Sequence, residues 1–423
     1  MQRFSLPTLF LLLFFVVVSP VQAQFATVKP AAAGFSPERL SRVDALLQDH
    51  VDRQQVAGVV TMVLRDGKAV HHKAFGQMDP EMNQAMRTDA IFRIASMSKA
   101  VTSIAVMMLY EEGRFQLNDP VYRFIPEFKD VTVAETAAEM PAGMPYYTVP
   151  AKRPITIRHL LTHTSGLTYG YGMAEETYRE AGLVGWYFAD KDETIGEAIR
   201  RMATLPLLAQ PGDRYQYGYS TDVLGYLVEQ VSGMPLDQFF AERIFKPLQM
   251  HDTYFYLPAE KANRLAPVYG LTDEGKLVKT EANDTTDYLH GPRKCFSGGA
   301  GLLSTASDYG RLLQMLLNGG TLDGVRLLGP KTVELMHQDH LGDKYPAYPG
   351  EGFGLGFWVL NDLGKYGELG TEGAYGWGSA YYPIYWIDPK ERLIGIIMTQ
   401  LRPTNGLALN RLFQRSVYQA LVK

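Results

Sequence analysis

Ser96 and Lys99 have the residue types and the spacing needed for nucleophilic catalysis. An apolar helix is expected to begin at this point, running from 96 to about 112 and ending at Gly113. Helical spacing of three puts the two side chains on one face, about 5–6 Å apart at Cβ. A serine hydroxyl is a weak nucleophile until a neighbouring group takes its proton, and a partly buried lysine can share that task. Taken alone, the pair is more often a capping serine and a solvated lysine.

Tyr217 is the second candidate, and it follows a Pro-Gly turn in the segment PGDRYQYGYS at 211–220. A helix is expected directly afterwards, over 220–231, so the phenol stands on a short, rigid loop. A phenol held near a cationic lysine has its pKa lowered and can then act as a general base. A packed tyrosine with a satisfied hydroxyl is the alternative, and this segment alone would favour it.

The third candidate is the glycine-rich segment YGWGSA at 375–380, which is expected to open a strand over 380–388. Glycine at a strand edge lets a substrate approach the backbone closely, and an N–H group there can stabilise an oxyanion. A bulge or bend in an edge strand is the alternative.

Helices and strands predicted on both sides of these segments would have to position them. The chain begins with an amphipathic helix over 36–53 and two strands over 57–64 and 69–75, and it ends with strands over 353–360, 380–388 and 392–400 and a helix over 406–421. Helical periodicity dominates between these ends, over 194–203, 220–231, 237–244, 306–318 and 330–338. The predicted fold class is therefore α/β of the α+β kind. A sheet assembled from both ends of the chain would be covered on one face by the terminal helices, with a helical insertion between its two parts.

Composition excludes some classes of function. The 423 residues carry 41 Lys and Arg against 45 Asp and Glu, a formal charge of −4, so no basic excess is present to bind nucleic acid. The single cysteine, Cys295, has no histidine close in sequence and is interpreted as a packed small residue. His163 is interpreted as a structural turn residue, and His337 and His340 have no carboxylate motif nearby, so we expect neither a metal site nor a cofactor.

The first 23 residues have the pattern of a signal peptide. Arg3 gives a positive start, residues 9–18 are an unbroken apolar run, and Val21 to Ala23 offer a cleavage site after Ala23. The run is too short for a comfortable membrane span, although an uncleaved anchor is the alternative. We therefore expect a periplasmic or secreted mature chain over 24–423 with no stable membrane anchor.

The order and separation of the three candidate segments resemble the serine β-lactamase and penicillin-binding-protein superfamily. Further matching segments are LNDPV at 117–121, IRHLLTHTSGL at 157–167 and GGAGL at 298–302, so that the resemblance runs from about residue 36 to about 420. The closer likeness is to class C-like esterases, the family VIII carboxylesterases, because STDVLG at 220–225 follows the tyrosine. The resemblance implies a β-lactamase/transpeptidase-like fold with an antiparallel sheet. It divides the domain into a sheet part at about 36–80 and 350–423 and a helical part at about 81–349.

The resemblance also implies roles for the site residues. Ser96 would be the acylated nucleophile, and Lys99 and Tyr217 would be the paired proton acceptors and donors. The backbone N–H groups of Ser96 and Ala380 would form the oxyanion hole, with Ser379 as the alternative donor if the motif slips by one position. Trp377, Gly378 and Ser379 would occupy the place of a Lys-Thr-Gly motif, and with Tyr219 they are the predicted substrate-binding residues.

Two departures from the lactamase pattern bear on the substrate. Tyr219 stands where class C β-lactamases have an asparagine that contacts the substrate amide, and Trp377 stands where they have a lysine that helps to hold the carboxylate. Tryptophan offers one N–H and no charge. Losing a charge-assisted contact costs about 1.5–3 kcal/mol. The site is therefore predicted to suit a neutral ester better than an anionic β-lactam.

Aromatic residues of the segment 168–189 could wall an apolar acyl pocket, and a packed helical flap is the alternative. They are Tyr169, Tyr171, Tyr178, Trp186, Tyr187 and Phe188. The predicted function is an exported serine hydrolase of small esters, or of amides, acting through an acyl-enzyme. A β-lactamase or D-Ala-D-Ala-type peptidase is the second hypothesis, and a non-catalytic binding protein that retains the fold is the third. Neither transfer to an alcohol instead of water nor the oligomeric state is determined by these residues.

Overall fold

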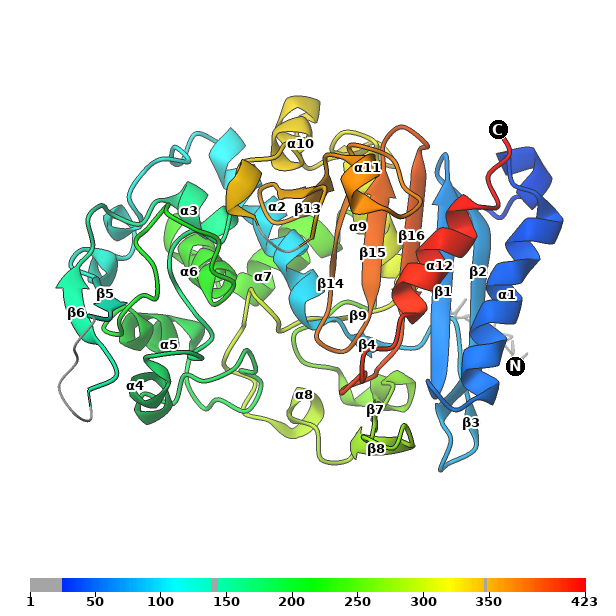
Figure 1. Cartoon of the computed structure of the whole chain (residues 1–423), viewed down its shortest axis with the longest axis horizontal. Coiled ribbons are helices and arrows are strands. Elements are labelled where there is room, and N and C mark those ends of the chain that lie inside the picture. Colours follow the sequence, from blue (N-terminus) through cyan, green and yellow to red (C-terminus); the bar gives the residue numbers. More distant parts are fainter. Residues whose placement is uncertain (1–24, 138–143, 346–347) are drawn as a thin grey trace, which may run out of the picture.

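The computed structural model describes residues 25–137, 144–345 and 348–423. An eight-stranded sheet with the order β12-β13-β14-β15-β16-β1-β2-β3 forms one side of the molecule, on the right in Figure 1, and most of the helices lie on the other side. All seven neighbouring pairs are antiparallel, which confirms the predicted sheet. The strands are β1 (Gly58–Arg65), β2 (Lys68–Asp79), β3 (Gln84–Ala85), β12 (Glu351–Phe353), β13 (Trp358–Leu360), β14 (Tyr375–Gly378), β15 (Ile384–Asp388) and β16 (Leu393–Met398).

The two ends of the chain meet at the pair of β1 and β16. Val60 of β1 lies opposite Met398 of β16, and the register continues to Arg65 opposite Leu393. Every residue of β1 before Arg65 is buried. This explains why its sequence, GVVTMVLR, is a nearly continuous apolar run rather than an alternating one.

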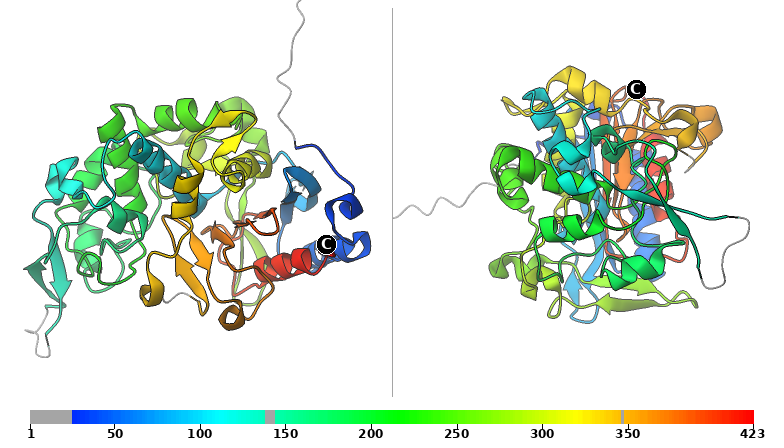
Figure 2. Two further views of the ribbon diagram at one scale, coloured as in Figure 1. Left: turned by 90° about the horizontal axis from the view of Figure 1, so that it is seen from above. Right: turned by 90° about the vertical axis from the view of Figure 1, so that its left-hand side faces the viewer.

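The terminal helices α1 (Pro37–Asp52) and α12 (Leu409–Tyr418) pack together on one face of the sheet (Figures 1 and 2). Ser36 caps α1 by accepting a hydrogen bond from the Arg39 amide at 3.2 Å. Leu40, Val43 and Leu47 of α1 share a buried cluster with Phe413 and Val417 of α12 and with the inner face of the sheet. Both helices were predicted, although α12 is shorter than the expected 406–421.

Two strand predictions near the C-terminus are wrong in detail. Residues 353–360 form no single strand, because the chain reverses between β12 and β13 at Gly356, whose φ of 101° favours glycine. The glycine-rich segment does not open a strand at 380. Its residues 375–378 form β14, and the turn from Ser379 to Pro383 then leads into β15. Tyr382 in that turn has a φ of 80°, which is incompatible with an extended strand.

The other face of the sheet is covered by α9 (Ala306–Leu317), which packs against β1, β15 and β16. Beside it, α2 (Ser98–Glu111) is buried over nearly its whole length and packs against α6 (Ser220–Ser232) (Figure 1). The remaining helices are α3 (Ile157–Leu161), α4 (Glu175–Glu180), α5 (Ile195–Met202), α7 (Leu236–Phe240), α8 (Asp287–His290), α10 (Pro330–Met336) and α11 (Leu363–Tyr366). Small antiparallel pairs join β4 (Phe92–Arg93) to β9 (Leu303–Ser304), β5 (Thr132–Glu135) to β6 (Tyr147–Pro150), β7 (Val268–Leu271) to β8 (Leu277–Glu281), and β10 (Thr321–Leu322) to β11 (Val325–Arg326).

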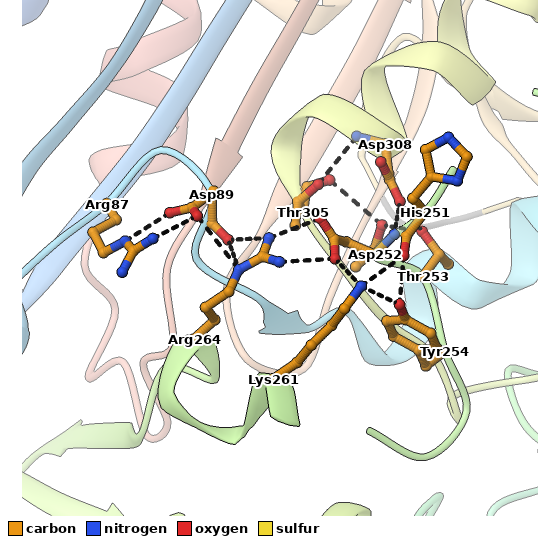
Figure 3. A network of polar contacts seen from close by, with 11 residues as sticks. Arg87, Asp89, His251, Asp252, Thr253, Tyr254, Lys261, Arg264, Thr305 and Asp308 are labelled. Carbon is orange, nitrogen blue, oxygen red and sulfur yellow. Dashed lines mark hydrogen bonds and ion pairs between the residues drawn. The ribbon is translucent and has the colours of Figure 1, made fainter. Parts of the chain in front are cut away.

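A network of ion pairs anchors the segment that enters β4 (Figure 3). Arg264 binds Asp252 with two nitrogens, each 2.8 Å from a carboxylate oxygen, and also donates to the Asp89 carbonyl at 2.7 and 2.9 Å. Lys261 lies 2.6 Å from the same Asp252 carboxylate, and Arg87 forms a two-point contact with the Asp89 side chain. Because Asp252 is buried, its negative charge is stabilised by Arg264 and Lys261, and removing either cation would destabilise the fold.

The predicted signal peptide lies outside the described residues. Within the described residues, no helix has both the length and the apolar character needed to cross a membrane.

Candidate active site

Ser96 lies on a short 3-10 turn, Ala95–Met97, between β4 and α2. The helix predicted to start at 96 therefore starts two residues later. Ala95, directly before the serine, has a φ of 36°, a strained conformation for a residue with a Cβ. The Tyr309 hydroxyl of α9 donates to the Met97 carbonyl at 2.8 Å and so fixes the end of this turn. Local strain and a buried hydrogen bond thus set the direction in which Ser96 leaves the backbone.

Lys99 occupies the first turn of α2 and is only 2 % exposed. Its ammonium group donates to three acceptors: the Ser96 hydroxyl at 3.3 Å, the Tyr169 hydroxyl at 3.0 Å and the Gly299 carbonyl at 2.8 Å. An ammonium has three N–H donors, so all of them are used. Full use of its donors allows a buried lysine to keep one orientation.

Tyr217 completes the cluster from the loop before α6. Its hydroxyl donates to Ser96 Oγ at 2.9 Å, and its ring lies 4.7 Å from Lys99 Nζ. Trp377 Nε1 donates to the same phenol oxygen at 3.3 Å. The Tyr217 hydroxyl is thus within hydrogen-bond reach of the Ser96 oxygen, with Lys99 near its ring and Trp377 at its hydroxyl, which is the position required of a group that exchanges a proton with the serine.

His163 packs against this tyrosine, with ring centroids 4.8 Å apart, and has a φ of 52° in the turn after α3. Its carbonyl accepts from the Gln216 amide at 2.7 Å, which ties the turn to the loop that carries Tyr217. Burial, together with the charge of Lys99, holds the pKa of His163 well below its usual value. The imidazole therefore stays neutral and supports the phenol by packing.

Ala380, the predicted second oxyanion donor, lies in the turn between β14 and β15. It packs against a buried cluster that includes Ala95 and Tyr381, and this places it beside the nucleophile turn. Within the described parts of the chain, the backbone N–H groups of Ser96 and Ala380 have no hydrogen-bond acceptor. The alternative residue, Ser379, uses its hydroxyl to accept from the Tyr381 amide at 3.2 Å and its carbonyl to accept from the Tyr382 amide.

The structure gives three of the predicted substrate-binding residues other tasks. Tyr219 is buried, and its hydroxyl donates to the Gly185 carbonyl at 2.5 Å. The single N–H of Trp377 is directed at Tyr217. Gly378 pairs with Ile384 at the end of β14, where a Cβ would lie 3.3 Å from the isoleucine side chain.

The contact between Tyr169 and Lys99 was not predicted from the sequence, because Tyr169 was considered only as part of a pocket wall. Tyr169 lies in the loop after α3, 70 positions from Lys99, and its hydroxyl accepts from Lys99 Nζ. Its ring packs edge-on against both Tyr217 and Tyr219, at 5.5 and 4.9 Å between centroids. No spacing or periodicity signals such a contact, which depends on two loops meeting over α2.

A cavity of about 510 Å³ has no lining residue in common with the Ser96–Lys99–Tyr217 cluster, but two of its wall residues pack beside Ala95. Trp186 and Tyr381, whose rings meet edge-on at 5.4 Å, form part of its wall and pack beside Ala95. Tyr171 and Tyr187 also line it, whereas Tyr169, Tyr178 and Phe188 are buried in the core. The aromatic segment 168–189 is therefore partly cavity wall and partly core.

Other reactive side chains do not gather here. Cys295 is buried, and burial raises the pKa of its thiol, so it has no thiolate character. Among the described residues, no three His, Cys, Asp or Glu side chains lie close enough together to hold a metal ion.

A buried lysine and a tyrosine converging on one serine, at the junction of an antiparallel sheet and a helical layer, define a serine hydrolase. The chain belongs to the Beta-lactamase family, whose model matches residues 43–419. The predicted resemblance is thereby confirmed, and the protein is an enzyme of the β-lactamase fold.

Its relatives include esterases. The chain is 38% identical to Protein Rv1367c of Mycobacterium tuberculosis, over 85% of this chain and 89% of that protein. It is 30% identical to Esterase EstB of Burkholderia gladioli, over 88% of this chain and 94% of that one. Among solved structures, EstCE1, described as a hydrolase with promiscuous acyltransferase activity, superimposes with a TM-score of 0.76 at 28% identity, covering 91% of this chain and 99% of that one.

Proposed function

We propose that this protein is an exported serine esterase that cleaves small esters through an acyl-enzyme on Ser96, with Lys99 and Tyr217 moving the proton. The observation that carries the proposal is the pair of contacts on one oxygen atom: Ser96 Oγ lies 2.9 Å from the Tyr217 hydroxyl and 3.3 Å from Lys99 Nζ. The distance to Tyr217 is within the reach required for direct proton transfer, and the distance to Lys99 is just beyond it.

The reaction begins when Ser96 Oγ attacks the ester carbonyl carbon and its proton passes to the Tyr217 oxygen, with the Tyr217–Lys99 pair reacting in the form that carries one proton fewer. The carbonyl oxygen becomes an oxyanion that accepts from the N–H groups of Ser96 and Ala380. Collapse of this intermediate breaks the bond to the alcohol oxygen, which takes the proton from Tyr217. Water then attacks the acyl-enzyme, gives one proton to Tyr217 and releases the acid, and that proton returns to Ser96.

The surroundings of the serine favour a neutral substrate. The Trp377 side chain beside Tyr217 has no charge, and its only N–H is already bonded. The cavity lined by Trp186 and Tyr381 also carries Glu281, Asp287 and Arg402, so it offers an aromatic wall for an apolar group beside polar side chains. We propose that the apolar acyl or alcohol part of the ester binds there.

The leader-like residues 1–23 support a periplasmic or secreted location. The similarity to EstCE1, a hydrolase with promiscuous acyltransferase activity, supports acyl transfer as a second activity of the same acyl-enzyme, with an alcohol taking the place of water.

A paired assay on purified mature protein tests the proposal. It compares hydrolysis of p-nitrophenyl butyrate with that of a chromogenic cephalosporin, using Ser96→Ala as the control. We expect fast ester cleavage, slow cephalosporin cleavage and loss of both activities in the variant. Faster cephalosporin cleavage would identify a β-lactamase, and activity that survives in Ser96→Ala would refute the mechanism.

A further inference from the structure

The loop 297–302 closes over α2 at the level of Lys99. Its Gly298 carbonyl accepts from Thr102 Oγ1 at 2.7 Å, and its Leu302 amide donates to Ser98 Oγ at 3.0 Å. Between these two bonds, the Gly299 carbonyl accepts from Lys99 Nζ at 2.8 Å. The glycine-rich segment noted in the sequence therefore provides one of the three acceptors that orient the lysine.

Asp222 of α6 holds the same loop from the opposite side. Its Oδ1 accepts from Ser297 Oγ at 2.6 Å and from the Gly299 amide at 3.0 Å, and the Ser297 hydroxyl in turn accepts from the Ala300 amide at 3.0 Å. The side chain is 1 % exposed. A buried carboxylate with these bonds fixes the peptide whose carbonyl faces Lys99.

We infer that Asp222 is a positioning residue for catalysis, which acts through the Gly299 carbonyl to hold Lys99 against Ser96. This inference rests on the proposed esterase mechanism and adds a residue that contacts neither the substrate nor the nucleophile. The fit is tight, because a Cβ added at Gly299 would lie 2.4 Å from Asp222 Oδ2. Only glycine at 299 lets the carboxylate approach the backbone this closely.

The negative charge of Asp222 also attracts the Lys99 ammonium, which adds to the effect of its hydrogen bonds on the position of the lysine. Burial raises the pKa of its carboxyl, whereas the Ser297 hydroxyl and the positive charge of Lys99 oppose that rise. Among the residues that the structure describes, the other titratable groups that face Lys99 are Tyr169, Tyr217 and His163. Asp222 is thus the acidic group of this surrounding set, and its loss changes the electrostatic balance at Lys99.

Two substitutions separate these effects. Asp222→Asn keeps an oxygen that can accept both hydrogen bonds and removes the charge, whereas Asp222→Ala removes both. The matched control is Asp308→Asn, because Asp308 is another buried aspartate that accepts one amide and one hydroxyl, from Asp252 N at 2.6 Å and Thr253 Oγ1 at 3.0 Å. It lies outside the contacts of Lys99. A general loss of packing would affect both sites alike.

The experiment measures kcat and KM for p-nitrophenyl butyrate across pH, together with the rate at which a fluorophosphonate labels Ser96 and the thermal unfolding of each variant. For Asp222→Ala we expect kcat and labelling to fall about 100-fold with KM nearly unchanged, because small displacements of catalytic groups cost about that much. Asp222→Asn should restore most of kcat and shift the acidic limb of the kcat/KM profile to lower pH. Asp308→Asn should match the wild type per folded molecule.

The labelling rate separates this inference from the proposed function. A wild-type protein that labels rapidly but hydrolyses no ester would refute the esterase proposal, and the labelling rates of the variants would still test Asp222. A folded Asp222→Ala protein with wild-type labelling would overturn the inference. Equal losses in Asp222→Asn and Asp308→Asn would also overturn it, because they would indicate a purely structural role.

Discussion

Replacing Tyr169 by phenylalanine removes one oxygen atom and tests whether this residue belongs to the catalytic cluster. In the structure the Tyr169 hydroxyl accepts from Lys99 Nζ at 3.0 Å, and the lysine is 2 % exposed. Water therefore has little access to replace the lost acceptor, and one of the three N–H donors is left unpaired. The ring itself remains and keeps its packing against Tyr217 and Tyr219.

The size of the effect follows from the type of bond. A hydrogen bond to a charged group contributes about 1.5–3 kcal/mol. If this energy holds Lys99 in place for proton transfer, its loss lowers kcat by about 10- to 150-fold, since about 1.4 kcal/mol corresponds to a factor of ten. KM for a small ester should change little, because Tyr169 is buried beside Lys99 rather than exposed in the cavity.

The assay is steady-state hydrolysis of p-nitrophenyl butyrate, with thermal unfolding measured in parallel. Tyr219→Phe is the matched control: it makes the same chemical change in a neighbouring buried tyrosine, whose hydroxyl donates to the Gly185 carbonyl and not to Lys99. We expect kcat to fall in Tyr169→Phe and to stay within about threefold of wild type in the control, as for a change outside the proton path. The reasoning fails if Tyr169→Phe is fully active, or if both variants lose activity in proportion to their stability.

Three further changes have defined outcomes. Trp377→Lys places a cation where the tryptophan N–H now donates to Tyr217. The ratio of kcat/KM for a cephalosporin to kcat/KM for an ester should rise by about tenfold or more. An unchanged ratio would contradict the argument that the missing charge disfavours anionic substrates. Arg264→Met leaves the buried Asp252 carboxylate without its two-point partner, so calorimetry should detect a loss of about 3 kcal/mol in the free energy of unfolding, which an unchanged melting temperature would exclude. Burial raises the pKa of Glu351 to about 7, so its protonated form adds stability at pH below about 4.5 that is lost as pH rises through 7. The melting temperature of Glu351→Gln should therefore fall less than that of the wild type between pH 5 and 8. Equal falls in the two proteins would contradict the raised pKa of Glu351.

Much of the fold could be predicted because its signals are local. Ser36, Pro37 and the apolar stripe of α1 specify a capped amphipathic helix whatever it packs against. The buried runs of β1 and β16 likewise have the composition of central strands. The errors fall where non-local packing decides, as at β14, where two glycines weaken the strand pattern and pairing with β13 and β15 supplies the missing stability.

The candidate site divides in the same way. Ser96 and Lys99 are close in sequence, so their proximity follows from almost any helical turn. Tyr217 and Trp377 were predicted from the order of the motifs along the chain. That order indicates which segments come together, but it does not indicate which atoms are in contact. The prediction that Tyr219 binds substrate was drawn from its position in the motif, whereas its burial and its bond to the Gly185 carbonyl depend on the packing of two loops.

The amino-acid sequence by itself determined the family, the proposed nucleophile and most of the helices and strands around it, because these depend on residue types at short or ordered spacings. Only the tertiary structure decided what surrounds Lys99. Tyr169, Gly299 and Asp222 come from three separate loops and helices, and each reaches the lysine or its neighbour through a single hydrogen bond. Such contacts have no periodicity along the chain, since they arise only when α2, α6 and the loop 297–302 pack against one another and bury the charges between them.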